Sequence, residues 1–363
     1  MDDAKFMRRA VELASTTVGS VSPRPPVGAL VVSPSGEIVG EGWDVASPGP
    51  HAEVMALEAA GSSAHGATVY STLEPCSHTG ATGPCADALI AAGVKRVVVG
   101  VRDPNPKVSG RGLRRLRAAG INVRTGVARA ACWSLIEPFG KWIRSGLPFI
   151  TLKMAATLDG KIAAPDGTSR WITGPKARAE VHDLRRRVDA VLVGSMTVAR
   201  DDPLLTYRLE NATTPQPLRV VIDGSGRTPP EARVFNDDAS TLVVTSETIT
   251  EDHVEAWRSA GAEVVRVPAG ESGIDVRSAL EVLGARGLCH VLVEGGPTIA
   301  SSFVERGLVD RFVLYVAPKL LGGDAPGLLN DGAKTLSDAW SLRIDGIRRV
   351  GDDIRIDASP ERA

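Results

Sequence analysis

The chain has few aromatic residues and no excess of positive charge. Phe, Tyr and Trp make up only 4% of its 363 residues, and 42 Lys and Arg stand against 43 Asp and Glu, which gives a formal charge of -1. Proteins that hold long nucleic acids rely on a positive field and on aromatic stacking surfaces. The composition offers neither, so we expect no nucleic-acid partner.

Cysteine is also scarce, and long apolar runs are missing. Four cysteines are too few for a disulfide framework, and Cys132 and Cys289 lie in apolar sequence that is typical of buried, inert thiols. No stretch approaches the ~18 apolar residues of a membrane span. The acidic start, Met1-Asp2-Asp3, is unlike a secretory signal. We therefore expect a cytoplasmic protein that does not associate with membranes.

The length and the composition indicate a globular protein with more than one domain. Hydrophobic residues make up 43% of the chain and charged residues 23%, as in ordinary folded proteins, and 363 residues exceed what one core usually supports. A helical pattern over residues 128–146 ends at Gly146-Leu147-Pro148, a strong stop signal. We place the boundary there, between domains 1–146 and 147–363.

Apolar periodicity predicts an alternation of helices and strands in both domains. In the first domain it predicts helices at 6–14, 52–60, 85–92, 112–119 and 128–146, and strands at 29–32, 38–40, 67–72, 96–101 and 121–123. In the second it predicts helices at 175–187, 251–260, 276–284 and 297–305, and strands at 149–154, 190–193, 219–222, 241–245, 263–267, 290–294 and 311–316. The alternation is typical of α/β domains with mostly parallel sheets.

An imidazole, two thiols and a carboxylate occur together in the first domain. His51, Cys76 and Cys85 suit a zinc ion that keeps its fourth position for water. Glu53 stands two residues from His51 and suits the proton transfers of that water. The set is the pattern of zinc-dependent base deaminases, although eight residues separate the cysteines here where that pattern has two.

Two other interpretations of these residues stay open at this point. A closed zinc site in a scaffold or sensor would need a fourth ligand, for which His78 is the nearest candidate, and it would not need Glu53. A deaminase that acts on nucleic-acid bases would share the same ligands. The charge balance and the shortage of aromatic residues weigh against the second of these.

The second domain lacks the G-x-G-x-x-G fingerprint of Rossmann dinucleotide sites. Instead, an apolar strand over 290–294 runs into Gly295-Gly296 and a helix that starts at Pro297. Glycines allow a diphosphate to approach the backbone, and a helix N-terminus offers donors and positive potential. The same pattern is also compatible with a plain strand-to-helix turn.

Several motifs resemble the family of bifunctional riboflavin-biosynthesis deaminase/reductases. The resemblance runs from about residue 4 to about residue 356. The motifs are, in order, His51-Ala52-Glu53, Thr72-Leu73-Glu74-Pro75-Cys76-Ser77-His78, Asp103-Pro104-Asn105-Pro106, Gly110-Arg111-Gly112, Leu152-Lys153-Met154-Ala155-Ala156-Thr157-Leu158-Asp159-Gly160, Asp201-Asp202-Pro203, Glu294-Gly295-Gly296-Pro297-Thr298 and Ala317-Pro318-Lys319-Leu320-Leu321-Gly322. Arg24 departs from the usual pattern, because family members often have asparagine there, close to the deaminase substrate.

This resemblance implies a cytidine-deaminase-like αβα domain followed by a dihydrofolate-reductase-like α/β domain. It implies hydrolytic deamination of 2,5-diamino-6-(5-phosphoribosylamino)pyrimidin-4-one, followed by reduction of the ribosyl to the ribityl side chain. The cofactors would be Zn²⁺ and NADPH, the only partner a small phosphorylated pyrimidine, and the assembly a homo-oligomer, either a dimer or a tetramer. No basic residue identifies a contact to the 2′-phosphate of NADPH by spacing alone.

The resemblance also assigns residues in this chain. Zinc would be held by His51, Cys76 and Cys85, with Glu53 as the proton shuttle. The cofactor would contact Ala155, Trp171, Thr197, Asp201, Gly296, Pro297, Thr298, Ile299, Ala300, Ser301 and Ser302. The substrate of the reductase would contact Ser169, Arg185, Leu205, Arg208 and Glu294, and Lys153 or Asp201 would polarise or protonate the sugar.

Some of these assignments have simple structural alternatives. The two arginines Arg185 and Arg208 suit a phosphate, because a guanidinium offers two parallel donors. Arg185 nevertheless belongs to the run Arg185-Arg186-Arg187, and such runs commonly form a solvated helix face. Trp171 is equally compatible with a place in the hydrophobic core.

Overall fold

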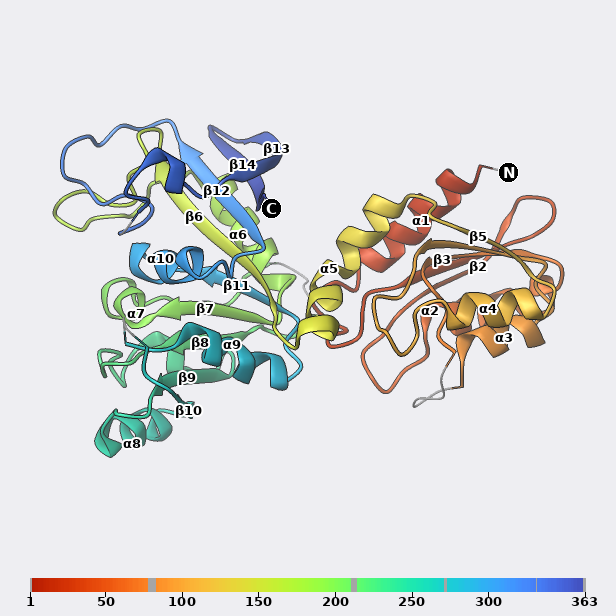
Figure 1. Ribbon diagram of the computed structural model, residues 1–363, viewed down its shortest axis with the longest axis horizontal. Coiled ribbons are helices and arrows are strands. Elements are labelled where there is room, and N and C mark those ends of the chain that lie inside the picture. The colour runs from red at the N-terminus through yellow and green to blue at the C-terminus, as the bar shows by residue number, and fades with distance from the viewer. Residues whose placement is uncertain (1, 78–82, 210–213, 271–272, 331, 362–363) are drawn as a thin grey trace. The chain divides into compact units, whose positions relative to one another are not determined.

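The computed structural model describes residues 2–77, 83–209, 214–270, 273–330 and 332–361. The chain forms two compact units, residues 1–147 and 148–363. Each unit has its own sheet (Figure 1). Within the described ranges, none of the helices combines the length and the apolar character that a membrane span requires.

The first unit is a five-stranded sheet covered by helices. Its helices are α1 (Asp3–Ser15), α2 (Ala52–Ala60), α3 (Cys85–Ala91), α4 (Arg111–Ala118) and α5 (Arg129–Ser145). Its strands are β1 (Gly28–Val32), β2 (Ile38–Trp43), β3 (Thr68–Leu73), β4 (Arg96–Val101) and β5 (Asn122–Thr125), in the order β2-β1-β3-β4-β5. Strands β3, β4 and β5 are parallel. The expectation of a mostly parallel sheet was wrong, because β1 runs antiparallel to both β2 and β3.

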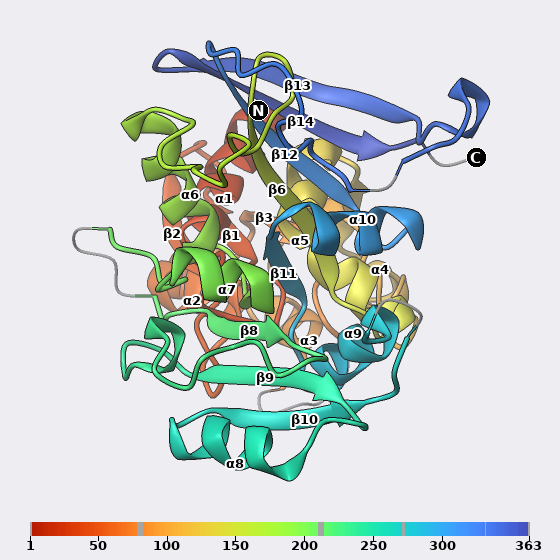
Figure 2. The ribbon, with the colours of Figure 1, turned by 90° about the vertical axis from the view of Figure 1, so that its left-hand side faces the viewer.

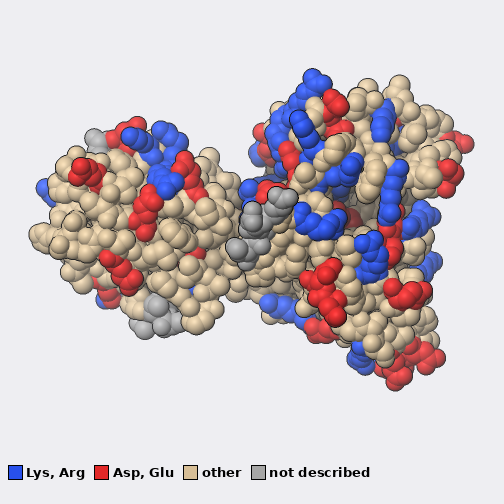
Figure 3. Space-filling view, turned by 180° about the vertical axis from the view of Figure 1, so that it is seen from behind, with Lys and Arg blue, Asp and Glu red and all other residues tan. Residues whose placement is uncertain are grey.

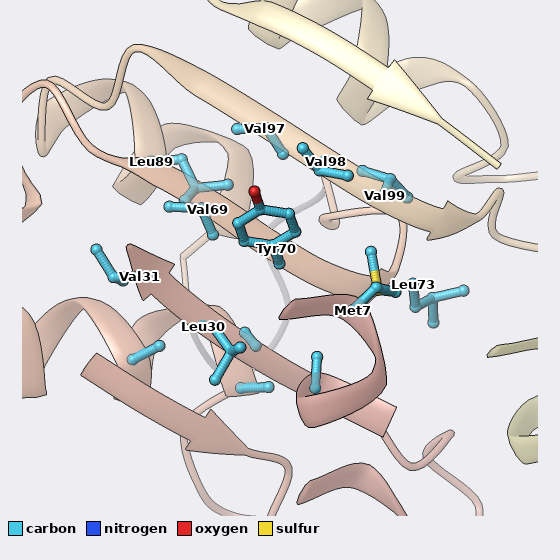
Figure 4. Packing of buried hydrophobic residues seen from close by; sticks show 14 of the residues in the cluster. Met7, Leu30, Val31, Val69, Tyr70, Leu73, Leu89, Val97, Val98 and Val99 are labelled. Carbon is cyan, nitrogen blue, oxygen red and sulfur yellow. The ribbon is translucent and has the colours of Figure 1, made fainter. Parts of the chain in front are cut away.

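Apolar side chains from both faces of this sheet form the core of the first unit. All residues of β1 and β3 are buried, as expected for central strands with both faces covered. Figure 4 shows Met7 of α1 and Leu89 of α3 among the side chains of β1, β3 and β4. Helix α1 begins where expected, since the Asp2 carboxylate accepts hydrogen bonds from the first backbone N–H groups of the helix.

Helix α2 lies unusually close to strand β2. A Cβ atom at Gly42 would lie 2.1 Å from the carbonyl oxygen of Ala52, and one at Gly40 would lie 2.1 Å from that of Ala56. Only glycine permits this approach of the two backbones. The N-terminus of α2 is therefore held at a fixed place over the sheet, which matters because His51 immediately precedes it.

The second unit is a nine-stranded sheet. Its helices are α6 (Pro175–Arg186), α7 (Ser195–Asp201), α8 (Glu251–Ser259), α9 (Val276–Ala285) and α10 (Pro297–Glu305). Its strands are β6 (Phe149–Thr157), β7 (Ala190–Gly194), β8 (Leu218–Ile222), β9 (Thr241–Ser246), β10 (Glu263–Val267), β11 (His290–Glu294), β12 (Arg311–Ala317), β13 (Leu342–Val350) and β14 (Asp353–Pro360), in the order β10-β9-β8-β7-β11-β6-β12-β14-β13. Helix α7 and strands β13 and β14 were not predicted.

The strands from β10 to β12 in this order are parallel, and β14 is antiparallel to β12 and β13. The carboxyl ends of the parallel strands therefore meet at one edge of the sheet. Figure 2 shows β8 and β9 side by side, with α7 and α10 in front of the sheet. In open α/β sheets this edge is where ligands bind.

Candidate active sites

In the first unit the structure brings His51, Cys76 and Cys85 together. His51 is the N-cap of α2, Cys85 is the first residue of α3, and Cys76 follows β3. The Nδ1 atom of His51 lies 3.2 Å from Sγ of Cys85 and 3.7 Å from Sγ of Cys76. The three ligand atoms lie within 4.8 Å of one another, and no further His, Cys or carboxylate from the described ranges joins them. His78 lies outside the described residues.

The surroundings of these side chains suit a zinc ion. The backbone N–H of Cys85, at the start of α3, donates to Sγ of Cys76 over 3.2 Å. The neighbouring thiol of Cys85 and the ring of His51 lower the pKa of Cys76, which favours its thiolate form. One imidazole and two sulfurs at this spacing are an appropriate donor set for zinc.

Glu53 lies in the first turn of α2 and is almost completely buried, with 3% of its surface exposed. Burial raises the pKa of Glu53, because it disfavours the charged form. The Ser71 hydroxyl donates to Oε1 of Glu53 over 3.0 Å. This carboxyl group is thus held by a hydroxyl hydrogen bond and removed from bulk water, as a proton-transferring group requires.

A second buried carboxylate, that of Asp44, holds the start of α2. Its Oδ1 accepts a hydrogen bond of 2.8 Å from the backbone N–H of Ala52. Burial raises the pKa of Asp44 to about 6. Asp44 was not among the predicted residues. The sequence offered little signal for it, because a cap normally lies next to its helix and Asp44 precedes α2 by eight residues.

Glu74 holds the segment that leads to Cys76. Its Oε2 accepts hydrogen bonds from the backbone N–H groups of Gly110, at 2.9 Å, and Asp103, at 3.4 Å. Its Oε1 accepts from Gly112, at 3.1 Å, and Leu113, at 3.3 Å. A Cβ at Gly112 would lie 2.0 Å from the carbonyl oxygen of Pro75, so the start of α4 is pressed against the residue before Cys76.

Arg24 is bound to the protein backbone. Its Nη1 donates to the carbonyl oxygens of Val45, at 3.1 Å, and Gly49, at 3.2 Å, and its Nη2 also donates to Gly49. These carbonyls belong to the segment that leads into His51. The guanidinium thus connects the residue 24 region to the approach to the metal ligands.

In the second unit a cavity of about 820 Å³ lies at the carboxyl edge of the sheet. Residues in or directly after β6, β7, β8 and β11 contribute to its wall. Of the residues predicted to bind cofactor or substrate, or to act in the reduction, the cavity is lined by Lys153, Ala155, Ser169, Trp171, Thr197, Asp201, Glu294, Gly296, Pro297, Thr298, Ile299 and Ser302. Trp171 is 61% exposed and lies against the Arg178 guanidinium, which is 4.5 Å from the ring centre. The alternative of a core tryptophan is therefore wrong.

Five predicted residues do not line this cavity. Ala300 and Ser301 are buried, because the helical turn of α10 points them to the protein interior while Ile299 and Ser302 face the cavity. The other three are Arg185, Leu205 and Arg208. Leu205 is 1% exposed, and it adopts a positive φ of 57°.

Arg185 belongs to a cluster of buried charges beside the cavity. Its Nε and Nη2 donate to the two carboxylate oxygens of Glu294 over 2.6 and 3.1 Å, and its Nη1 donates to the carbonyl of Thr206 over 2.9 Å. The Nζ atom of Lys153 lies 4.0 Å from the same carboxylate. Burial lowers the pKa of Lys153. The alternative of a solvated helix face does not hold for Arg185.

Arg208 lies near this cluster but is more exposed. Its Nη1 lies 3.5 Å from the hydroxyl of Thr206 and its Nη2 lies 3.4 Å from Nε2 of His182, both long contacts. Burial and the charges of Arg185 and Arg233 lower the pKa of Arg208. An anion placed here would relieve this repulsion between cations.

The cavity is also lined by residues that were not predicted. Among them are Arg200 of α7 and, in the turn after β8, Ser225 and Arg227. A signal for the turn was present, since Gly224-Ser225-Gly226 directly follows an apolar strand and Asp223. It was not recognised because no motif of the resemblance covers this segment.

The two sites define the class of the protein. The first unit places a His-Cys-Cys metal site and a buried glutamate at two helix N-termini of an α/β fold, which is the arrangement of zinc-dependent deaminases. The second unit has a cavity of about 820 Å³ at the edge of a mainly parallel sheet, with a glycine turn and a helix N-terminus in its wall. The chain is therefore a two-domain enzyme that combines a deaminase with a nucleotide-dependent domain.

Comparisons with known proteins agree with this assignment. Residues 1–101 match the cytidine and deoxycytidylate deaminase zinc-binding region, and residues 148–356 match the RibD C-terminal domain. The riboflavin biosynthesis protein RibD of Escherichia coli is 42% identical over 98% of both chains. That of Mycobacterium tuberculosis is 40% identical over 96% of this chain and 94% of its own.

Solved structures give the same result over the full chain. An Acinetobacter baumannii RibD structure is similar with a TM-score of 0.89 and 35% identity, and covers 99% of both chains. The Thermotoga maritima diaminohydroxyphosphoribosylaminopyrimidine deaminase/5-amino-6-(5-phosphoribosylamino)uracil reductase has a TM-score of 0.87 and 38% identity, over 99% of this chain and 98% of its own.

The chain belongs to the RibD family of riboflavin biosynthesis proteins. It is a bifunctional enzyme, with a zinc-dependent deaminase domain of the cytidine deaminase type followed by an NADPH-dependent reductase domain. On the face shown in Figure 3, Lys and Arg are interspersed with Asp and Glu without forming a continuous positive surface.

Proposed function

We propose that residues 1–146 deaminate 2,5-diamino-6-(5-phosphoribosylamino)pyrimidin-4-one and that residues 147–363 then reduce the ribosyl group of the product to a ribityl group. The observation that carries the first step is the convergence of His51, Cys76 and Cys85 beside the buried Glu53. The observation that carries the second is the cavity beside the Lys153–Glu294 pair.

In the deaminase, His51, Cys76 and Cys85 would hold the zinc ion. Zinc supplies a Lewis acid that makes water a usable nucleophile at neutral pH. Glu53 takes a proton from the attacking water and delivers it to the amine that leaves the pyrimidine ring. Because Oε1 of Glu53 accepts from Ser71, we assign this proton to Oε2. The raised pKa of Glu53 suits a group that must both accept and release a proton.

In the reductase, NADPH supplies the hydride that the sugar carbon accepts. The pKa of Lys153 is lowered by burial, so its ammonium is a better proton donor than an exposed lysine. Lys153 would protonate the sugar oxygen of the opened ribose, and Glu294 would keep Lys153 and Arg185 in place. Asp201, at the end of α7 and in the cavity wall, is the alternative proton donor.

Arg208 and Arg185 would share the recognition of the substrate phosphate. All three kinds of donor nitrogen in Arg185 are already used by Glu294 and Thr206. Among the described residues, the Arg208 side chain has only long contacts, so its guanidinium is the group available for direct binding. Arg185 then contributes mainly positive potential, and its hydrogen bonds hold Glu294 in place. Ser169 and Leu205 would complete the substrate side, Ser169 from the cavity wall.

The wall of the cavity at β11 would receive the diphosphate of the cofactor. Gly296 is the N-cap of α10 and Pro297 its first residue, so the helix N-terminus opens into the cavity. The Gly296 N–H lies 3.3 Å from the hydroxyl of Thr197, which ties this turn to α7. Ala155, Trp171, Thr298, Ile299 and Ser302 line the same space. Ala300 and Ser301 would support the turn from the protein interior.

A coupled assay tests both steps. The diaminopyrimidine phosphate is supplied with NADPH, and release of ammonia and oxidation of NADPH are followed separately. Removal of zinc with a chelator should stop ammonia release, while reduction of separately supplied deaminated substrate continues. Ammonia release that survives complete zinc removal would exclude the proposed deaminase site.

We also propose that the protein acts in the cytoplasm as a homo-oligomer, either a dimer or a tetramer. The four cysteines are free, which suits a reducing compartment. Strand β13 is the last strand of its sheet, and Ile344 and Ile347 on it are 58% and 61% exposed. Exposed apolar residues on an edge strand favour association with another chain.

A further inference from the structure

Helix α6 places a histidine beside the cluster of buried charges next to the reductase cavity. His182 lies three residues before Arg185, so both side chains lie on the same side of α6. The segment from Thr206 to Arg208 packs against this side. The Thr206 carbonyl accepts from Nη1 of Arg185 over 2.9 Å, and the backbone N–H of Arg208 donates to Nδ1 of His182 over 3.3 Å. His182 therefore lies next to the guanidinium to which the proposed function gives the substrate phosphate.

Both ring nitrogens of His182 face donors of Arg208. Nδ1 faces the backbone N–H, and Nε2 lies 3.4 Å from Nη2 of the guanidinium. A neutral imidazole accepts at one nitrogen and donates at the other. Whichever nitrogen carries the proton, one N–H group of the ring therefore points at another donor.

The backbone contact indicates which nitrogen accepts. The main chain fixes the direction of the Arg208 N–H, so we assign Nδ1 as its acceptor and place the proton of the ring on Nε2. The Thr206 carbonyl also acts on the ring, but it already accepts from Arg185. Within the described ranges, neither Nε2 of His182 nor Nη2 of Arg208 has a hydrogen-bond contact other than the one with each other. An acceptor that reaches both groups would satisfy both.

The charges around His182 favour a neutral ring and an incoming anion. The charged groups that act on the ring are Arg185 from the same helix, Arg208 from the segment after α7 and Glu294 from β11. Burial and the two guanidinium groups lower the pKa of His182, so the ring is neutral near pH 7. Glu294 forms ion pairs with Lys153 and Arg185. In the described ranges no carboxylate forms an ion pair with Arg208. Positive charge is thus in excess here, and an anion would reduce it.

We propose that His182 is a further phosphate-binding residue of the reductase, and that its Nε2–H donates, together with the Arg208 guanidinium, to the phosphate of the reductase substrate. The proposal rests on the proposed function of the second unit. A phosphate oxygen beside Nε2 and Nη2 would accept from both groups and would remove the unfavourable contact between two donors. The histidine then helps the enzyme to distinguish its substrate from the same compound without phosphate.

Two substitutions of similar shape separate phosphate binding from support of the backbone. In His182→Asn the amide occupies the place of Nδ1, so it keeps an acceptor for the Arg208 N–H but has no donor near the phosphate. In His182→Gln the amide reaches the place of Nε2 and keeps a donor for the phosphate. The control is Arg187→Ala, at the end of α6, where the side chain is 45% exposed and pairs with Asp183.

The experiment uses the full-length, zinc-loaded protein with saturating NADPH. KM and kcat are measured for the deaminated substrate and for the same compound without its phosphate, and release of ammonia is followed separately. H182N should raise the KM for the phosphorylated substrate by about tenfold or more, because a hydrogen bond to a charged group is lost. H182Q should stay within about threefold of the unmodified protein, since it keeps the donor.

The other constants should not respond to these variants. In both variants and in the control, kcat, the rate of ammonia release and the kcat/KM for the compound without phosphate should change less than about twofold. A contact that is made equally in the ground state and in the transition state affects KM and leaves kcat unchanged.

Three results would overturn the proposal. An unchanged KM in H182N would remove His182 from the site. An equal loss of kcat/KM for the compounds with and without phosphate would show that the histidine supports the backbone and does not bind the phosphate. A KM in H182Q as high as that in H182N would contradict donation from Nε2. Failure of the proposed function is distinguishable from all three, because the unmodified protein would then reduce neither compound.

Discussion

Replacement of Glu74 by glutamine is the most direct test of how the deaminase site is held. Glu74 lies two residues before Cys76, and the hydrogen bonds that its carboxylate accepts come from backbone N–H groups and not from the metal ligands. Its two carboxylate oxygens each accept two backbone N–H groups from the segment between residues 103 and 113. Glutamine keeps the shape of the side chain but replaces one oxygen by an NH₂ group.

The size of the effect follows from these four hydrogen bonds. The NH₂ group of glutamine would face two backbone N–H groups, so the two hydrogen bonds on that side are lost. The two hydrogen bonds to the remaining oxygen are kept, but their acceptor is no longer charged. A hydrogen bond to a charged group contributes ~1.5–3 kcal/mol. Two of the four bonds are long, at 3.3 and 3.4 Å, which reduces their share. We therefore expect a loss of about 3 kcal/mol in the local stability of this segment.

Zinc retention is the appropriate assay, because the segment that is loosened presses on Pro75. The zinc-loaded variant is mixed with a chromogenic chelator, and the rate of zinc release is compared with that of the unmodified protein. Release should be at least about tenfold faster, since a ligand that is less well positioned binds its metal more weakly. Hydrogen exchange at the amides of Gly110 and Gly112 should accelerate as well.

Two controls make the result interpretable. Glu58→Gln changes an exposed carboxylate on α2 and should have no effect. Reduction by the second unit should continue at its normal rate in both variants. If E74Q released zinc at the normal rate and its amides at 110 and 112 remained protected, the role of Glu74 in positioning Cys76 would be wrong.

Three further predictions concern single side chains. Glu53→Ala should lower ammonia release by about 10²–10⁴-fold, with an unchanged zinc content by elemental analysis and an unchanged rate of NADPH oxidation; deamination at the normal rate would refute the proton-transfer role. Arg208→Ala should raise the reductase KM for its phosphorylated substrate by about tenfold or more through the loss of a charged contact, without affecting deamination, and an unchanged KM would remove Arg208 from the site. Hydrogen bonds from Arg96 and Tyr70 lower the pKa of Asp3 to about 2. The Asp3 carboxylate therefore stabilises the first unit above its ordinary pKa, by about 2 kcal/mol, and this contribution disappears as the pH falls toward 2. Asp3→Asn should thus be less stable in urea at pH 7, and the difference from the unmodified protein should shrink between pH 4 and pH 2; a difference independent of pH would contradict this.

The sequence predicted most elements with strong local signals. The metal ligands came together because His51 and Cys85 lie at two helix starts, which the pattern of apolar residues located correctly. The hairpin of β13 and β14 was missed although a signal exists, since Gly351-Asp352 is a two-residue turn between strands that pair from Val350 and Asp353. Exposed arginines interrupt the apolar alternation of β13 and obscure it.

Other parts of the sites depend on contacts that local sequence does not encode. Helix α7 is only seven residues long, too short for a periodic pattern. Asp44 and Glu74 act on backbone groups elsewhere in the chain, and Glu74 reaches residues 29 to 39 positions away. The sequence predicted that all residues from Gly296 to Ser302 bind the cofactor. A helix directs successive side chains to different faces, and here Ala300 is buried while Ser302 lines the cavity.

The buried carboxylate of Asp223 has a consequence for how this enzyme can change over evolutionary time. Its hydrogen bonds with the backbone N–H groups of Ser225, Gly226 and Thr228 determine the course of the backbone in this turn. Substitutions at positions 225 and 227 can therefore alter the chemistry of that corner without remodelling the loop. The shape of this part of the cavity wall can persist while its side chains change, provided that the aspartate beneath them is retained.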